Sequence, residues 1–187
     1  MSKNLSDRYR RWFDYEKDSH AKTIASLHAV PSELRDNEAF RKAVYLMGHI
    51  IAARRMWLFR LGVVEQAVEL FPPNVTLEQV TVEISEMEEV WSEYLLRIDD
   101  AELERVVEYQ SYEGPRFRNT IEEILTQLFG HSWYHRGQIA QLIRSIGAEP
   151  AVTDFIFWAR EPIYLTSLRA HGTNFKVFKA RLVVQSP

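Results

Sequence analysis

The sequence contains no cysteine, and this absence removes several kinds of chemistry at once. Disulfide bonds, thiolate metal ligands and cysteine nucleophiles are all excluded for this chain. Glycine and proline are also scarce, with 7 of each among 187 residues. Because most of them fall between periodic segments, the composition favours long helices over many short strands.

The chain also lacks an excess of positive charge and any long apolar run. Its formal net charge is -3, whereas nucleic-acid binders normally carry a basic excess that pairs with phosphates. No stretch approaches the roughly 20 apolar residues that span a bilayer, and the polar N-terminus is unlike a signal peptide. We therefore expect a cytoplasmic protein that binds neither nucleic acid nor membranes. Segment 163–187 holds four basic residues and no acid, which is typical of a solvated edge: Arg169, Lys176, Lys179 and Arg181.

Hydrophobic periodicity predicts four long helices. They cover about residues 5–29, 38–61, 77–98 and 121–147. Thr76 with Gln79, and Thr120 with Glu123, form capping boxes that mark the beginnings of the last two helices. The second helix is apolar nearly all round, so it must be covered on more than one side.

The segment VVEYQSYEGPRFRN separates the third long helix from the last one. Its valines and tyrosines surround Glu113-Gly114-Pro115, a pattern that predicts either a small hairpin or an irregular extended crossover. Its length would let the chain cross an end of the bundle instead of turning straight back. The sequence therefore predicts an all-α fold, a four-helix bundle with a long crossover connection and a short extended segment before the last helix.

The last helix carries His131 and His135 within an otherwise apolar stripe. Their i, i+4 spacing puts both imidazoles on one helix face, where both can reach the same ion. A buried ring nitrogen left unpaired costs about 1–3 kcal/mol, and a metal ion would satisfy both rings. The alternative is a pair of core histidines bonded to side chains or water. Arg136 points about 100° away from His135, so we expect it to form a salt bridge with a neighbouring helix.

Two imidazoles seldom hold a metal alone, so a third ligand is needed. His49 lies in the middle of the apolar second helix and is the best candidate, and His20, on the inner stripe of the first helix, is the second. Glu16 shares that stripe, and the two side chains could line the pocket or form structural hydrogen bonds. Gln138, one turn beyond His135, could orient a ligand or a water molecule. No catalytic residue can be named from the sequence.

Three segments of the chain resemble the DinB/YfiT-like helical bundles, a family often regarded as metalloenzymes. They are GHIIAARRMWLFRL, HSWYHRGQIAQLIRSIG and TDFIFWARE. Their order and spacing hold from about Leu5 to Glu161, so the resemblance covers most of the chain. It implies a bundle domain over residues 1–162, with residues 163–187 as a C-terminal extension.

The resemblance further implies a homodimer and a three-histidine metal site, which maps onto His49, His131 and His135. Three neutral imidazoles would leave a divalent ion (Zn, Ni or Fe) its full charge and an open position. Water bound there can have its pKa lowered to about 7, or a thiol can bind as thiolate.

Family members with known activity include S-transferases that use low-molecular-weight thiols. The implied function is therefore a metal-dependent transferase or hydrolase acting on an unidentified small molecule, with a thiol as one candidate co-substrate. The alternative is a non-catalytic metal-binding or dimeric interaction protein. That alternative predicts a fourth protein ligand, His20 or Glu16, or a site sealed by aromatic residues.

Overall fold

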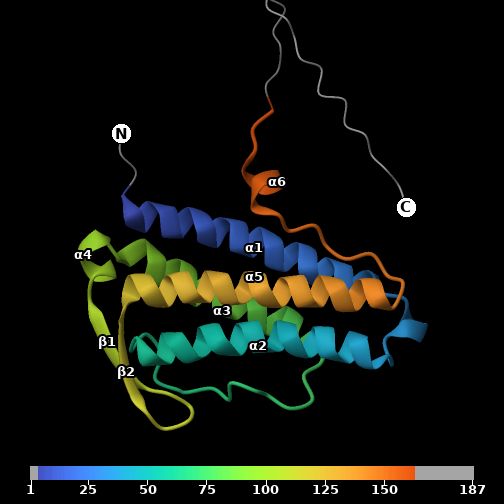
Figure 1. The fold of residues 1–187 in the computed structure, drawn as a ribbon, viewed down its shortest axis with the longest axis horizontal. Coiled ribbons are helices and arrows are strands. Elements are labelled where there is room, and N and C mark those ends of the chain that lie inside the picture. The colour runs from blue at the N-terminus through green and yellow to red at the C-terminus, as the bar shows by residue number, and fades with distance from the viewer. Residues whose placement is uncertain (1–3, 163–187) are drawn as a thin grey trace, which may run out of the picture.

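Four long helices form the body of the protein. The structure is a computed structural model that describes residues 4–162, so the extension predicted for residues 163–187 lies outside the described part. Figure 1 shows the long helices running side by side along the longest axis of the molecule. They are α1 (Leu5–Ala29), α2 (Glu38–Arg60), α3 (Leu77–Arg97) and α5 (Ile121–Ser145). These bounds confirm the all-α prediction.

Both predicted capping boxes are present at the beginnings of α3 and α5. The Thr76 hydroxyl accepts a hydrogen bond from the Gln79 backbone at 3.2 Å, and the Gln79 side chain accepts one from the Thr76 backbone at 2.9 Å. Thr120 and Glu123 repeat the arrangement at α5. These bonds satisfy amide groups that the first turn of a helix otherwise leaves free.

The helices enclose one hydrophobic core. α1 packs against α3 and α5, and α2 packs against the same two helices, with its most extensive contact to α5. The apolar circumference of α2 is therefore covered from two sides, as the sequence requires. The core includes large side chains from each helix, among them Phe13, Met47, Trp91 and Phe129.

Short elements complete the fold. The segment before α5 is a two-stranded antiparallel hairpin in which Glu108 pairs with Arg118, and Figure 1 places this hairpin at one end of the bundle. Of the two alternatives for this segment, the hairpin is confirmed. Periodicity cannot reveal helices as short as α4 and α6. The short elements are η1 (Ser32–Leu34), α4 (Asp100–Leu103), β1 (Val106–Gln110), β2 (Arg116–Thr120) and α6 (Phe155–Ala159). None of the described helices is both long and apolar enough to cross a membrane.

Candidate metal centre

Three histidines from two helices meet at one point of the α2–α5 contact. The Nε2 atom of His131 lies 3.2 Å from Nε2 of His49 and 3.1 Å from Nε2 of His135. One nitrogen from each ring lies within 4.8 Å of the other two. His49 is buried, whereas His131 and His135 are partly buried, so the group sits at the margin of the core.

The opposite nitrogens of two rings are held by hydrogen bonds. Nδ1 of His49 donates to the carbonyl oxygen of Leu70 at 3.0 Å, and Nδ1 of His135 donates to Oε1 of Gln138 at 2.7 Å. A carbonyl oxygen can only accept, so the proton of each neutral ring lies on Nδ1 and a lone pair remains on Nε2. Both lone pairs therefore face the centre of the group.

The surroundings favour the neutral form of His131 and His135. Burial, together with the neighbouring His135 and His49, lowers the pKa of His131 to about 4. Burial also lowers the pKa of His135. A neutral imidazole is the form that binds a metal ion, because the cation has no free lone pair.

The arrangement fits a divalent ion better than it fits a closed hydrogen-bond network. A proton on Nε2 of His131 could point at only one of its two neighbours. Nδ1 of His131 is buried and has no hydrogen-bond partner among residues 4–162. For metal–nitrogen bonds of about 2.1 Å, adjacent ligand atoms are about 3.0–3.4 Å apart in octahedral or tetrahedral geometry. The two Nε2 separations, 3.1 and 3.2 Å, fall in that interval.

A cavity of about 490 Å³ reaches His49 and His135. Among its lining residues Lys42 is the one with a formal charge, and its ammonium group lies 4.5 Å from the ring centre of Tyr45. The ring of Phe71 stacks on His49, with centroids 5.0 Å apart. The lining residues are Lys42, Tyr45, Leu46, His49, Phe71, Tyr134, His135, Gln138, Gln141 and Leu142. The cavity can therefore admit a small molecule to the ion-binding group.

Glu16 and His20 do not line this cavity. Both are buried in the core, where Glu16 forms ion pairs with Arg54 and Arg136. Nδ1 of His20 lies 2.8 Å from Oε1 of Glu88. The predicted salt bridge of Arg136 with a neighbouring helix is thus confirmed. Among the described residues, the ion-binding group contains neither Glu16 nor His20.

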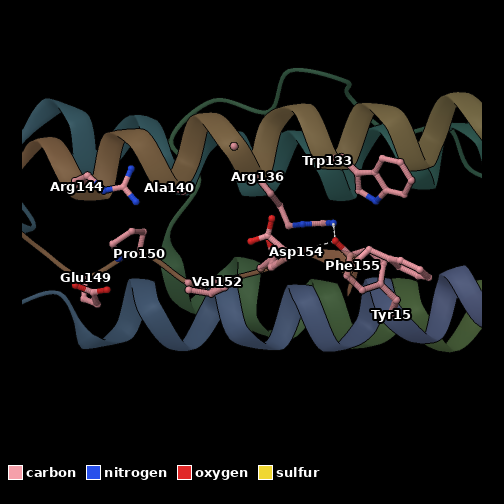
Figure 2. A pocket seen from close by; sticks show the side chains of 13 residues that line it. Tyr15, Trp133, Arg136, Ala140, Arg144, Glu149, Pro150, Val152, Asp154 and Phe155 are labelled. Carbon is pink, nitrogen blue, oxygen red and sulfur yellow. Dashed lines mark hydrogen bonds between the residues drawn. The ribbon is translucent and has the colours of Figure 1, made fainter. Parts of the chain in front are cut away.

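A second hollow of about 450 Å³ lies on a different face of α5. Figure 2 shows Arg136 reaching from α5 toward Tyr15 of α1, with Asp154 and Phe155 beside it. Nη2 of Arg136 lies 3.3 Å from the Tyr15 hydroxyl, which donates to the carbonyl oxygen of Thr153. The hollow is separate from the histidines and contains none of them.

Several cavity residues were not singled out from the sequence, although a signal for some of them was present. Lys42, Tyr45 and Leu46 precede His49 at positions i-7, i-4 and i-3, so they share its helix face. Phe71 gave no such signal, because it belongs to the loop between α2 and α3, and periodicity does not tell which way a loop side chain points.

Comparison with known proteins assigns the chain to a family. Residues 1–163 match the model of the DinB family. Protein DinB of Bacillus subtilis (strain 168) is 23% identical over 161 residues, which cover 81% of this chain and 93% of that protein. With four packed helices and a three-histidine cluster between two of them, this chain belongs to the DinB family.

Proposed function

We propose that this protein is a metal-dependent enzyme that acts on a small molecule, with His49, His131 and His135 as ligands of a divalent ion. The observation that carries the proposal is the convergence of three Nε2 atoms next to an open cavity. The hydrogen bonds at Nδ1 support it, because partners of this kind fix the tautomer and orientation of metal-binding histidines.

The proposed reaction is a transfer or a hydrolysis. When bound, a divalent ion with three neutral ligands supplies a Lewis acid that can activate water or a thiol. The protein would contribute Lys42, the charged residue of the cavity, to attract an anionic group of the ligand. Tyr45, Phe71 and Tyr134 would bind its apolar part. Zn, Ni and Fe are all compatible with imidazole ligands.

The non-catalytic alternative is less well supported. It expects a fourth protein ligand or a sealed site, whereas the described residues offer three ligands and a cavity that reaches two of them. The two functions are distinguished by the visible spectrum of Co²⁺-loaded protein after addition of azide or of 3-mercaptopropionate. A change in the visible spectrum indicates an open position, and a spectrum that responds to neither favours the non-catalytic protein.

The ligand assignment is tested by substitution. Metal content is measured by elemental analysis, and Co²⁺ titration gives the stoichiometry. We expect His49→Ala, His131→Ala and His135→Ala each to abolish stoichiometric binding while the far-ultraviolet circular dichroism stays helical.

Two other histidines serve as comparisons. His28→Ala is the control, because His28 is exposed and bonds to Thr81. His20→Ala should also retain binding if His49 is the third ligand. Full occupancy in the His131 or His135 variant would show that the assignment is wrong.

A further inference from the structure

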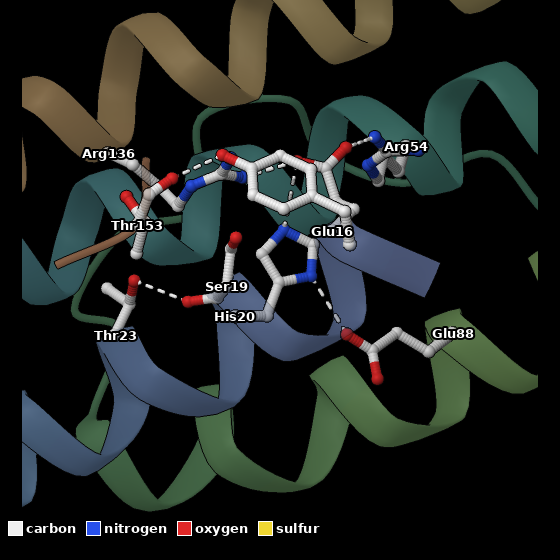
Figure 3. Close-up of polar contacts among 9 residues, drawn as sticks. Glu16, Ser19, His20, Thr23, Arg54, Glu88, Arg136 and Thr153 are labelled. Carbon is white, nitrogen blue, oxygen red and sulfur yellow. Dashed lines mark hydrogen bonds and ion pairs between the residues drawn. The ribbon is translucent and has the colours of Figure 1, made fainter. Parts of the chain in front are cut away.

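One buried carboxylate connects the two helices that carry the three histidines. Glu16 of α1 is completely buried, and Arg54 and Arg136 are 1% and 3% exposed. Oε2 of Glu16 accepts a hydrogen bond from Nη2 of Arg54 on α2, and Oε1 accepts one from Nη1 of Arg136 on α5. Figure 3 shows Glu16 between the two guanidinium groups.

The two arginines are close in sequence to the histidines of the centre. Arg136 directly follows His135 on α5, and Arg54 comes five residues after His49 on α2. At 3.6 residues per turn, these spacings place each arginine about 100–140° around its helix from the histidine. α2 therefore directs one histidine to the centre and α5 directs two, while each helix directs one arginine to Glu16.

The guanidinium group of Arg54 is held in place by its surroundings. It lies over the rings of Phe13, Trp91 and Phe129, with distances of 5.2–5.8 Å to the ring centroids. The indole N–H of Trp91 donates to the backbone carbonyl of Arg54 at 3.2 Å. Such a fixed group defines where the carboxylate of Glu16 must lie, and thereby where the second arginine must lie.

Stability alone does not account for this cluster. Burying charged groups carries a large desolvation cost, and well-packed apolar residues of similar volume often give equal or greater stability. Directed charge-assisted bonds, however, fix a geometry that apolar contacts leave looser. We infer that Glu16 is a positioning residue for the metal centre: by binding Arg54 and Arg136 together it sets the rotation and register of α2 against α5. This inference rests on the proposed function.

A small helix movement would be enough to disturb the centre. An imidazole lies about 5–6 Å from its helix axis, so a rotation of about 10° moves it by about 1 Å. Metal–ligand distances tolerate deviations of about 0.2 Å. The contact that fixes the rotation of α2 and α5 therefore affects metal affinity even though it touches none of the ligands.

The first test is Glu16→Gln, which keeps the shape of the side chain. An amide presents a donor to one of the two guanidinium groups, so it can keep one of the two bonds but not both. We expect the Kd for Co²⁺ to rise at least about 10-fold, the lower end for loss of outer partners of metal ligands. We also expect the visible Co²⁺ spectrum to change shape, a response that a purely structural role would not produce.

Glu88→Gln is the matched control, because Glu88 bonds to His20 and to neither arginine. It should bind Co²⁺ as the wild-type protein does. Wild-type affinity in Glu16→Gln, or an equal loss in both variants, would overturn the positioning role. Absence of metal binding in the wild-type protein would contradict the proposed function itself. Wild-type affinity in Glu16→Gln would contradict only the positioning role, so the two failures are distinguishable.

A second variant separates positioning from folding. Glu16→Leu/Arg54→Met/Arg136→Met removes all three charges together and should keep the free energy of unfolding near the wild-type value. We expect it to bind Co²⁺ as weakly as Glu16→Gln, because no directed bond sets the helix register. Wild-type affinity in this variant would show that packing alone positions the histidines.

Discussion

Gln138 is the residue whose side chain holds His135 in its metal-binding orientation. Its Oε1 accepts the hydrogen bond from Nδ1 of His135 at 2.7 Å. Gln138→Leu removes this acceptor and leaves the ring free to turn or to change tautomer. Such losses typically weaken metal binding about 10–100-fold, and isothermal titration with Zn²⁺ would measure the change.

Gln141→Leu is the control for that measurement. Gln141 lines the same cavity one turn further along α5. Within the described part of the chain, it takes no part in the hydrogen bonds of the three histidines. It should bind Zn²⁺ with nearly the wild-type affinity. Equal losses in the two variants would mean that Gln138 acts through cavity polarity and not through His135.

At the scale of elements, the loop between α2 and α3 can approach the metal centre because Gly48 of α2 faces this loop. A Cβ atom on Gly48 would lie 2.9 Å from Cγ1 of Val75, which is too close for a stable contact. The same loop supplies the Leu70 carbonyl that binds His49 and the Phe71 ring that stacks on it. The absence of a side chain at Gly48 therefore lets the loop reach the histidine.

Gly48→Ala should displace this loop and weaken Zn²⁺ binding. The branched side chain of Val75 sits close to its own backbone, so the loop must move with it. We expect a Kd at least about 10-fold higher, because the hydrogen bond to His49 is strained or lost.

Gly130→Ala is the matched control, since Gly130 precedes His131 as Gly48 precedes His49. A Cβ there meets no atom of the described chain within 4 Å. In that variant the free energy of unfolding should rise by about 0.5–1 kcal/mol through helix propensity, with unchanged affinity. An unaffected Kd in Gly48→Ala would contradict the role of the loop.

At the scale of the whole molecule, His20 and Glu88 offset each other in the pH dependence of unfolding. Burial lowers the pKa of His20 well below 6.5 and raises the pKa of Glu88 from 4.5 to about 7. Between pH 4.5 and 6.5 the folded protein holds the proton on Glu88, and the unfolded chain holds it on His20. Both states bind one proton, so the pair gives the wild-type protein no slope in this interval.

Glu88→Gln should expose the contribution of His20. The folded variant then binds no proton at this pair, whereas His20 in the unfolded chain still binds one below pH 6.5. The free energy of unfolding should therefore fall more steeply than in the wild-type protein as the pH falls below about 6.5, with an added slope of up to about 1.4 kcal/mol per pH unit. Urea unfolding at several pH values would measure it, and parallel curves for variant and wild type would refute the shared proton.

The sequence by itself determined the four long helices, because hydrophobic periodicity and the two Thr-based capping boxes are local signals. It also determined that His131 and His135 share a helix face, since that follows from helical geometry. The salt bridge of Arg136 with another helix was predictable for the same reason, although its partner was not.

Only the tertiary structure decided what these faces meet. It placed His49 against the pair on α5, moved Glu16 and His20 away from the cavity into a separate buried cluster, and brought the Leu70 carbonyl and Phe71 onto His49. The reason is physical. Periodicity fixes which side of a helix a residue occupies, but the partner of that side depends on how helices far apart in sequence rotate and slide until their side chains pack.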